Sequence, residues 1–210
     1  MLRTYLAVAG SLLVVLSLRV VASDDASPPP ANTLGVTVGE SLPAFECTDD
    51  SGKTWRSADH VARKVVVLYF YPGDFTGGCT RQAQAYRDAL AKIEELDAEV
   101  VGVSGDEVAT HELFKQTYGL THCLLADTDG QLAKLLGVPV KAGGRVRATG
   151  PDRKPLLNAD GQRIDLERPV TLARWTVVVD REGKIVSLRS IVNPVTDAGD
   201  VRKIVEALAK

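Results

Sequence analysis

Pro72-Gly-Asp-Phe-Thr-Gly-Gly-Cys79 is the stretch that decides both the fold and the chemistry. It joins Lys64–Tyr71, an apolar, β-branched run typical of a central strand covered on both faces, to Thr80–Leu96, whose apolar residues recur at helical spacing. Cys79 is therefore expected in the first turn of a helix, where the helix dipole favours thiolate over thiol. The Thr76 hydroxyl is close enough in sequence to reach it. This pattern indicates a reactive cysteine.

The remainder of the chain alternates strand and helix patterns, which predicts an α/β fold with a central mixed β-sheet flanked by helices. Asp106 is expected to cap the second helix, and Gly119 to end it. Residues 141–170 show little periodicity, apart from a hairpin turn expected at 158–161. The expected strands are one or two within 36–54, then 98–104, 122–126 and a hairpin of 174–179 with 184–188, and the expected helices are 108–118, 129–136 and 198–209.

The N-terminal segment has a different composition from the rest. Residues 1–22 combine a positive start, an apolar run and small residues, which is the layout of a secretory signal peptide. Arg19 at the end of the apolar run leaves an uncleaved membrane anchor as the alternative. Residues 23–34 are polar and proline-rich, as in an extended linker. We expect an exported protein, in the periplasm, cell envelope or extracellular space, with one folded domain over 35–210.

Composition and charge exclude several function classes. The net charge of −2 and the scattered basic residues give no electrostatic reason for nucleic-acid binding. The three cysteines, Cys47, Cys79 and Cys123, have no Cys-x-x-Cys spacing, which argues against a zinc site. No cofactor or metal is expected. An odd number of cysteines leaves at least one thiol outside any internal disulfide.

The segment around Cys79 resembles the peroxiredoxins, and most closely the Q-type group of bacterioferritin-comigratory proteins. The likeness rests on Pro72, Thr76 and Cys79 in a Pro-x-x-x-Thr-x-x-Cys pattern. Three further stretches support it over about residues 35–140 and 171–208: Gly39-Glu-Ser-Leu-Pro-Ala-Phe45, Phe114-x-x-x-Tyr-Gly-Leu120 and Arg174-Trp-Thr-Val-Val-Val-Asp180. The resemblance implies a thioredoxin-like fold and thiol-dependent reduction of hydrogen peroxide or small organic hydroperoxides.

The resemblance also implies a role for each matching residue. Cys79 corresponds to the peroxidatic cysteine, which becomes a sulfenic acid, and Thr76 to the threonine that orients the peroxide. Pro72 corresponds to the proline that shields the site, and Arg174 to the arginine near the sulfur. Taken from the residues alone, Cys79 is also compatible with a small buried hydrophobe. Thr76 is compatible with a helix cap, Pro72 with an ordinary turn, and Arg174 with a cross-strand pair on the sheet surface.

Two positions depart from the Q-type pattern. Gln84 stands where many members carry a resolving cysteine, and Gln82 where they commonly carry a glutamate. Cys123, and less readily Cys47, are candidates for a resolving cysteine, although both also fit buried structural positions. We expect a one-cysteine cycle with an external thiol reductant, either thioredoxin-like or a small thiol. The oligomeric state, monomer or dimer, is left open by the sequence.

Two other functions are compatible with the fold. A thioredoxin-like disulfide oxidoreductase would carry Cys-x-x-Cys, whereas this chain has Thr76-Gly-Gly-Cys79. A non-catalytic binding module would use residues 141–170 as its contact segment. The three histidines, His60, His111 and His122, show no metal or triad spacing and are expected at the surface or as caps.

Overall fold

A computed structural model describes residues 35–209, and the expected leader and linker lie outside these residues. Seven strands form one mixed sheet in the order β2-β1-β5-β4-β3-β8-β9. Strands β3, β4 and β5 run parallel, whereas β8 pairs antiparallel with β3. The strands are β1 (Glu46–Asp49), β2 (Thr54–Arg56), β3 (Val65–Phe70), β4 (Ala98–Ser104), β5 (Cys123–Ala126), β8 (Trp175–Val179) and β9 (Ile185–Arg189).

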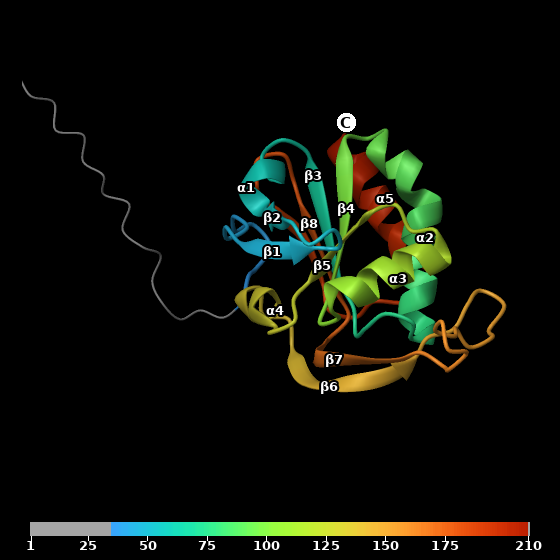
Figure 1. The fold of residues 1–210 in the computed structure, drawn as a ribbon. Helices are drawn as coiled ribbons and strands as arrows, with labels where there is room; N and C mark the ends of the chain where they lie inside the picture. The colour runs from blue at the N-terminus through green and yellow to red at the C-terminus, as the bar shows by residue number, and fades with distance from the viewer. Residues whose placement is uncertain (1–34, 210) are drawn as a thin grey trace, which may run out of the picture. The chain divides into compact units, whose positions relative to one another are not determined.

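Helices cover both faces of this sheet (Figure 1). The helices are α1 (Ser57–His60), α2 (Gly77–Glu94), α3 (Val108–Tyr118), α4 (Gln131–Leu135) and α5 (Asp197–Leu208). None of them, within 35–209, is long and apolar enough to cross a bilayer. The predicted thioredoxin-like fold, a central mixed sheet flanked by helices, is confirmed, and α1 is an element that was not predicted from the sequence.

Strand β3 lies at the centre of the core, and every one of its residues is buried. Alternate side chains point to opposite faces because a strand has a period of two. Val65, Val67 and Tyr69 pack with α2, α3 and α5, whereas Val66 and Leu68 pack with the second core that includes α4. The continuous apolar run from 65 to 71 is thus explained by burial on both faces.

Residues 141–170 are more regular than the sequence suggested. Strands β6 (Val140–Arg147) and β7 (Asp165–Leu172) pair antiparallel as a separate two-stranded ribbon. The turn expected at 158–161 is present, with Gly161 N–H donating to the Asn158 carbonyl over 3.0 Å. Neither strand was predicted from the sequence. Their segments contain Gly143, Gly144 and many charged residues, and glycine and several charged residue types are depleted in sheets.

Gly119 ends α3 in the left-handed conformation, with φ of 62°, as predicted. Asp106 does not cap that helix. Glu107 occupies the N-cap, and the Asp106 carboxylate instead accepts hydrogen bonds from the Asp74 N–H and the Ser104 hydroxyl. The prediction was wrong because two buried donors, the Asp74 N–H and the Ser104 hydroxyl, bind this carboxylate in place of the helix end.

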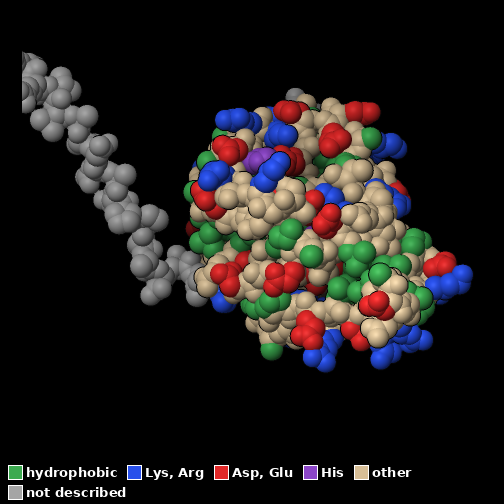
Figure 2. All heavy atoms as spheres, in the orientation of Figure 1, with side chains coloured by type: hydrophobic (Ala, Val, Ile, Leu, Met, Phe, Trp, Pro, Cys, Tyr) green, Lys and Arg blue, Asp and Glu red, His purple; other side chains and the backbone are tan. Residues whose placement is uncertain are grey.

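The surface of the domain carries mixed charge. On the face drawn in Figure 2, acidic and basic side chains are interspersed over the strands and the ribbon, without a large area of one sign. Glu99 shows the pattern, with ion pairs to His60 at 2.8 Å and to Lys64 at 3.3 Å.

Candidate active site

Cys79 is the third residue of α2, whose N-cap is Thr76. Its side chain is 1% exposed, so the sulfur is almost entirely removed from water. Arg174 Nη2 lies 3.1 Å from Cys79 Sγ, within hydrogen-bonding distance. A helix N-terminus and a guanidinium therefore both face one buried sulfur, and both favour its anionic form.

Sheet register explains why Arg174 reaches this position. Trp175, the first residue of β8, pairs with Phe70, the last residue of β3. The residue before β8 therefore lies where the chain leaves β3 for α2. Gly78 leaves room for the guanidinium, because a Cβ there would lie 3.3 Å from Arg174 Nη2. The alternative of a surface cross-strand pair for Arg174 is wrong.

Thr76 and Pro72 lie in the loop between β3 and α2, and both are half-buried. The Thr76 hydroxyl donates to the Gly73 carbonyl over 2.9 Å and makes no side-chain cap bond to the helix. Its proton is therefore engaged by the Gly73 carbonyl, while its lone pairs remain able to accept a hydrogen bond. Pro72 has no N–H and fixes its own φ, which stiffens the entry to the loop.

The loop is fixed from beneath by buried polar groups. Asp74 is fully buried, and its carboxylate pairs with Tyr71 Oη and His111 Nδ1, each over 2.8 Å. His111 Nε2 lies 3.2 Å from the Leu125 carbonyl. Both partners of this imidazole can only accept, so both ring nitrogens donate and the ring is an imidazolium. Burial is the largest single influence and lowers the pKa of His111, but the charge and hydrogen bond of Asp74, the charge of Asp106 and the Leu125 carbonyl together raise it overall.

Phe75 holds the same loop through its ring. Its backbone has φ of 56°, a conformation that costs a non-glycine residue about 1–3 kcal/mol. The ring packs edge-on against Phe114 at 5.1 Å and lies 5.9 Å from Tyr118. These contacts with α3 offset part of the cost of the backbone conformation.

Behind Arg174 lies a second buried network. Gln82 is fully buried; its Oε1 accepts from Arg174 Nη1, and its Nε2 donates to Asp197 Oδ2 over 2.8 Å. Gln82 thus contacts Arg174 although its side chain carries no charge. The carboxylate of Asp197 lies one hydrogen bond farther from Arg174.

The ribbon contributes one more arginine. Arg168 of β7 packs on Gly73, where a Cβ would lie 2.7 Å from Arg168 Nη1. Arg168 Nε donates to the Thr171 hydroxyl over 3.0 Å, while Nη1 is buried without a partner. The region that we expected to be irregular thus rests directly on the loop that carries Pro72 and Thr76.

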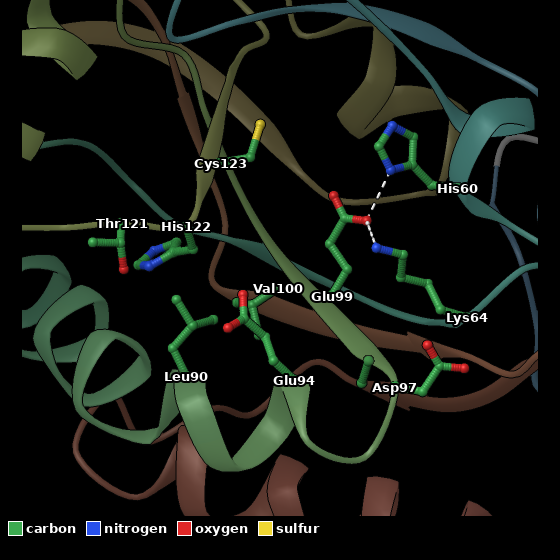
Figure 3. Close-up of a pocket in the computed structure, with 11 residues that line it drawn as sticks. His60, Lys64, Leu90, Glu94, Asp97, Glu99, Val100, Thr121, His122 and Cys123 are labelled. Carbon is green, nitrogen blue, oxygen red and sulfur yellow. Dashed lines mark hydrogen bonds and ion pairs between the residues drawn. The ribbon is translucent and has the colours of Figure 1, made fainter.

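The other two cysteines lie elsewhere, and both are free thiols. Cys123 lines a pocket of about 470 Å³ with Leu90 and Glu94 (Figure 3). Leu90 follows Cys79 by 11 residues, which is about 16 Å along a helix. Cys47 lies on β1. Burial and the Asp127 charge raise the pKa of Cys47 to about 12. Burial also raises the pKa of Cys123.

Several residues of the site were missed from the sequence. His111 is fully buried and His122 is 4% exposed, so the expectation of surface or capping histidines is wrong for these two. The spacing of His111, Phe114 and Tyr118 on one helical face could have revealed the first. Asp197 gave no usable signal, because an acid at the first residue of a helix resembles an ordinary cap. Within 35–209 no three side chains are grouped to hold a metal ion.

The chain is similar to known proteins in sequence and in fold. Peroxiredoxin Q, chloroplastic, of Suaeda salsa is 45% identical over 104 residues, covering 50% of this chain and 48% of that protein. Peroxiredoxin Q, chloroplastic, of Populus jackii is 43% identical over 109 residues, covering 52% and 51%. The chain thus spans about half the length of the curated relatives it matches.

Among solved structures, Peroxidoxin BcpB from Mycobacterium tuberculosis superposes with a TM-score of 0.63 at 27% identity, over 81% of this chain and 97% of that one. Xanthomonas campestris Peroxiredoxin Q shares the fold, with a TM-score of 0.61 at 24% identity over 79% and 92%. The profile of the AhpC/TSA family matches residues 38–188, and the chain therefore belongs to the AhpC/TSA family.

Proposed function

We propose that the protein is a thiol-dependent peroxidase that reduces hydrogen peroxide or small organic hydroperoxides through a sulfenic acid on Cys79. The observation that carries the proposal is the 3.1 Å contact between Arg174 Nη2 and Cys79 Sγ in the first turn of α2. A guanidinium remains charged at every pH at which proteins fold, so it stabilises the thiolate throughout that range. The similarity to proteins named Peroxiredoxin Q supports the same reaction.

In the first step the thiolate of Cys79 attacks one peroxide oxygen. The S–O bond forms as the O–O bond breaks, sulfur is oxidised to sulfenic acid, and the second oxygen leaves as hydroxide or alkoxide and takes up a proton. Arg174 and the free N–H groups at the start of α2 stabilise the charge on the leaving oxygen. Thr76, whose hydroxyl proton is bound to Gly73, accepts a hydrogen bond from the peroxide O–H. Pro72 limits the access of water.

In the second step an external thiol, thioredoxin-like or small, attacks the Cys79 sulfenic acid and releases water. A second thiol then breaks the mixed disulfide and restores the Cys79 thiol. Support for an external reductant comes from Gln84, which has no thiol, and from burial, which raises the pKa of both Cys47 and Cys123. A thiol that stays protonated is a poor nucleophile.

The function can be tested by intact mass after adding stoichiometric hydrogen peroxide to the full chain. The wild type and the matched controls Cys47→Ser and Cys123→Ser are expected to gain one oxygen, and Cys79→Ser is expected to gain none. A wild-type chain that does not react within minutes would rule out the peroxidase. Loss of two hydrogens with a Cys79–Cys123 or Cys79–Cys47 peptide would contradict the external reductant.

We also propose that residues 1–22 are a targeting segment, cleaved or retained as an anchor. Their positive start and apolar run support this, and the relatives from Suaeda salsa and Populus jackii are named as chloroplastic proteins. Expression of the full chain with a C-terminal tag, followed by fractionation and N-terminal sequencing, tests it. A tag found only in the compartment of synthesis, with Met1 intact, would contradict export.

A further inference from the structure

A buried carboxylate lies behind the arginine of the site. Asp197, the first residue of α5, is fully buried. Its Oδ2 accepts from Gln82 Nε2 at 2.8 Å, Tyr86 Oη at 2.7 Å and Thr176 Oγ1 at 2.8 Å, and its Oδ1 accepts from Arg189 Nη1 at 2.8 Å. Side chains of α2, β8 and β9 thus converge on one carboxylate, which has a donor for each oxygen.

Gln82 connects this carboxylate to the reacting sulfur. A guanidinium can only donate and a carboxylate can only accept, so the Gln82 amide has one orientation that satisfies both, with its oxygen toward Arg174 and its nitrogen toward Asp197. Arg174 then presents its other terminal nitrogen to Cys79 Sγ. A reversed amide would place an N–H₂ group against the guanidinium and release it from one side.

We propose that Asp197 is a positioning residue for the reaction: through Gln82 it holds the guanidinium of Arg174 against Cys79. The inference rests on the proposed function, because the peroxidase reaction requires Arg174 to stay aligned with the Cys79 sulfur. It also assigns a role to the glutamine at position 82. The negative charge that this position lacks is supplied from α5, one hydrogen bond farther from the sulfur.

Two physical effects of Asp197 have opposite signs. As a nearby negative charge it disfavours a second anion at Cys79, so removing it would make the thiol more reactive. As the group that orients Gln82 it keeps Arg174 on the sulfur, so removing it would make the thiol less reactive. A hydrogen bond to a charged acceptor is roughly twice as strong as a neutral one, and we expect the positioning effect to exceed the direct one.

The test measures the rate constant for alkylation of Cys79 by iodoacetamide, read by peptide mass spectrometry, and the rate of its oxidation by hydrogen peroxide. Asp197→Asn is expected to slow both by about tenfold, the lower end of the effect of outer-shell partners at metal sites. The double variant Gln82→Glu/Asp197→Asn places a carboxylate directly on Arg174 and is expected to recover to within about threefold of the wild type. Asp200→Asn is the matched control, because Asp200 also binds Arg189, at 3.0 Å, but is 38% exposed.

An Asp197→Asn rate equal to or above that of the wild type would overturn the proposal. So would a double variant as slow as the single one, since general damage to the fold would not be repaired by moving the charge. Gln82→Met covers the case in which Asp197→Asn does not fold. It cuts the link but leaves the bonds from Tyr86, Thr176 and Arg189 in place, and a wild-type rate in this variant would also overturn the proposal.

The alkylation readout separates the two proposals. If alkylation follows this pattern while peroxide leaves Cys79 unchanged, the peroxidase function fails and the positioning role of Asp197 stands. If peroxide oxidises the wild type but the variants alkylate at its rate, the function stands and the role of Asp197 fails.

Discussion

The two ends of helix α2 place a cysteine in opposite electrostatic surroundings. At its start, Cys79 faces Arg174 at 3.1 Å and the free N–H groups of the first turn. Beside its C-terminal half, Cys123 lines a pocket with Glu94 and Glu99, and burial followed by the charge of Asp50 raises the pKa of its thiol (Figure 3). Burial by itself makes a thiol unreactive. A cation aimed at the buried sulfur turns a similar position into a nucleophile.

The histidines repeat this contrast. His111, beneath the active-site loop, donates from both ring nitrogens, to the Asp74 carboxylate at 2.8 Å and to the Leu125 carbonyl at 3.2 Å. His122, beside Cys123, bonds only to Tyr69, over 2.7 Å, and its Nδ1 is buried without a partner. Burial, assisted by the charge of Lys115, lowers the pKa of His122 to about 4, so it is neutral. His111 is therefore a charged histidine beneath the active-site loop, whereas His122 is a neutral one beside Cys123.

The largest expected effect is the difference in reactivity among the three thiols. A thiol with pKa about 12, as at Cys47, is ionised at pH 7 roughly 3,000-fold less than an ordinary thiol of pKa ~8.5. We therefore expect iodoacetamide to label Cys79 at least about 1,000-fold faster than Cys47 or Cys123 in the native chain. Time-resolved peptide mass spectrometry measures all three rates in one sample, with the urea-unfolded chain as control. Equal alkylation rates for the three cysteines in the native chain would contradict the difference in reactivity between Cys79 and the other two thiols.

The second largest expected effect is the slowing of Cys79 oxidation when the positive charge of Arg174 is removed. Arg174→Gln keeps a hydrogen-bond donor near Cys79 but removes the charge, and we expect oxidation by peroxide to slow by about 10²–10³-fold, as when one oxyanion donor is lost. Stopped-flow or quenched intact-mass measurements give the rate. Arg81→Gln is the control, because Arg81 is exposed on the same helix. A rate within twofold of the wild type in Arg174→Gln would assign the reactivity to the helix start alone.

The position of Cys79 at the start of α2 could be predicted because the local sequence determines it. The strand-turn-helix order around Pro72–Cys79 placed the cysteine at a helix start, and it lies there, at the third position of α2. Arg174 was named through its family resemblance, since alternation along β8 could not say whether it faced the sulfur or the solvent. Its contact depends on a register between strands that are far apart in the sequence.

The supporting residues could not be predicted for the same reason. Asp197 reaches Gln82 across 115 residues, and His111 reaches Asp74 across 37, so neither pairing leaves a short-range pattern. Strands β6 and β7 were missed because their mutual pairing stabilises them against unfavourable composition. Long-range hydrogen bonds, formed only in the folded chain, determine which polar residues are buried.

A smaller effect appears in the pH dependence of stability. The folded pKa of His122 is about 4, below its ordinary value of 6.5, so the unfolded chain binds this proton first. The stability from His122 is present above pH 6.5 and is lost as the pH falls toward 4, in total about 3 kcal/mol. Urea unfolding at pH 7 and pH 4.5 should show this loss in the wild type. His122→Phe should reduce it.

His111 should respond in the opposite direction. Its folded pKa is raised, so its contribution is present below pH 6.5 and is lost as the pH rises through the folded value. His111→Gln should therefore lose stability relative to the wild type at acidic pH, and the difference should shrink at alkaline pH. If both histidine variants instead shifted the curve in the same direction, the contrast between a charged His111 and a neutral His122 would be wrong.

The smallest effect asks whether charge or burial controls Cys123. Glu99 is the acid of that pocket that pairs with His60 and Lys64. Burial is the main cause of the raised pKa of Cys123, and the charge of Glu99 contributes less than the charges of Asp50 and Asp49. Glu99→Gln should therefore speed alkylation of Cys123 by less than about fivefold, equivalent to the ~1 kcal/mol upper range of exposed ion pairs. An increase above tenfold would mean that the pocket is held unreactive by its acid. The difference between the two ends of α2 would then be one of charge alone, and a single substitution could bring Cys123 toward the behaviour of Cys79.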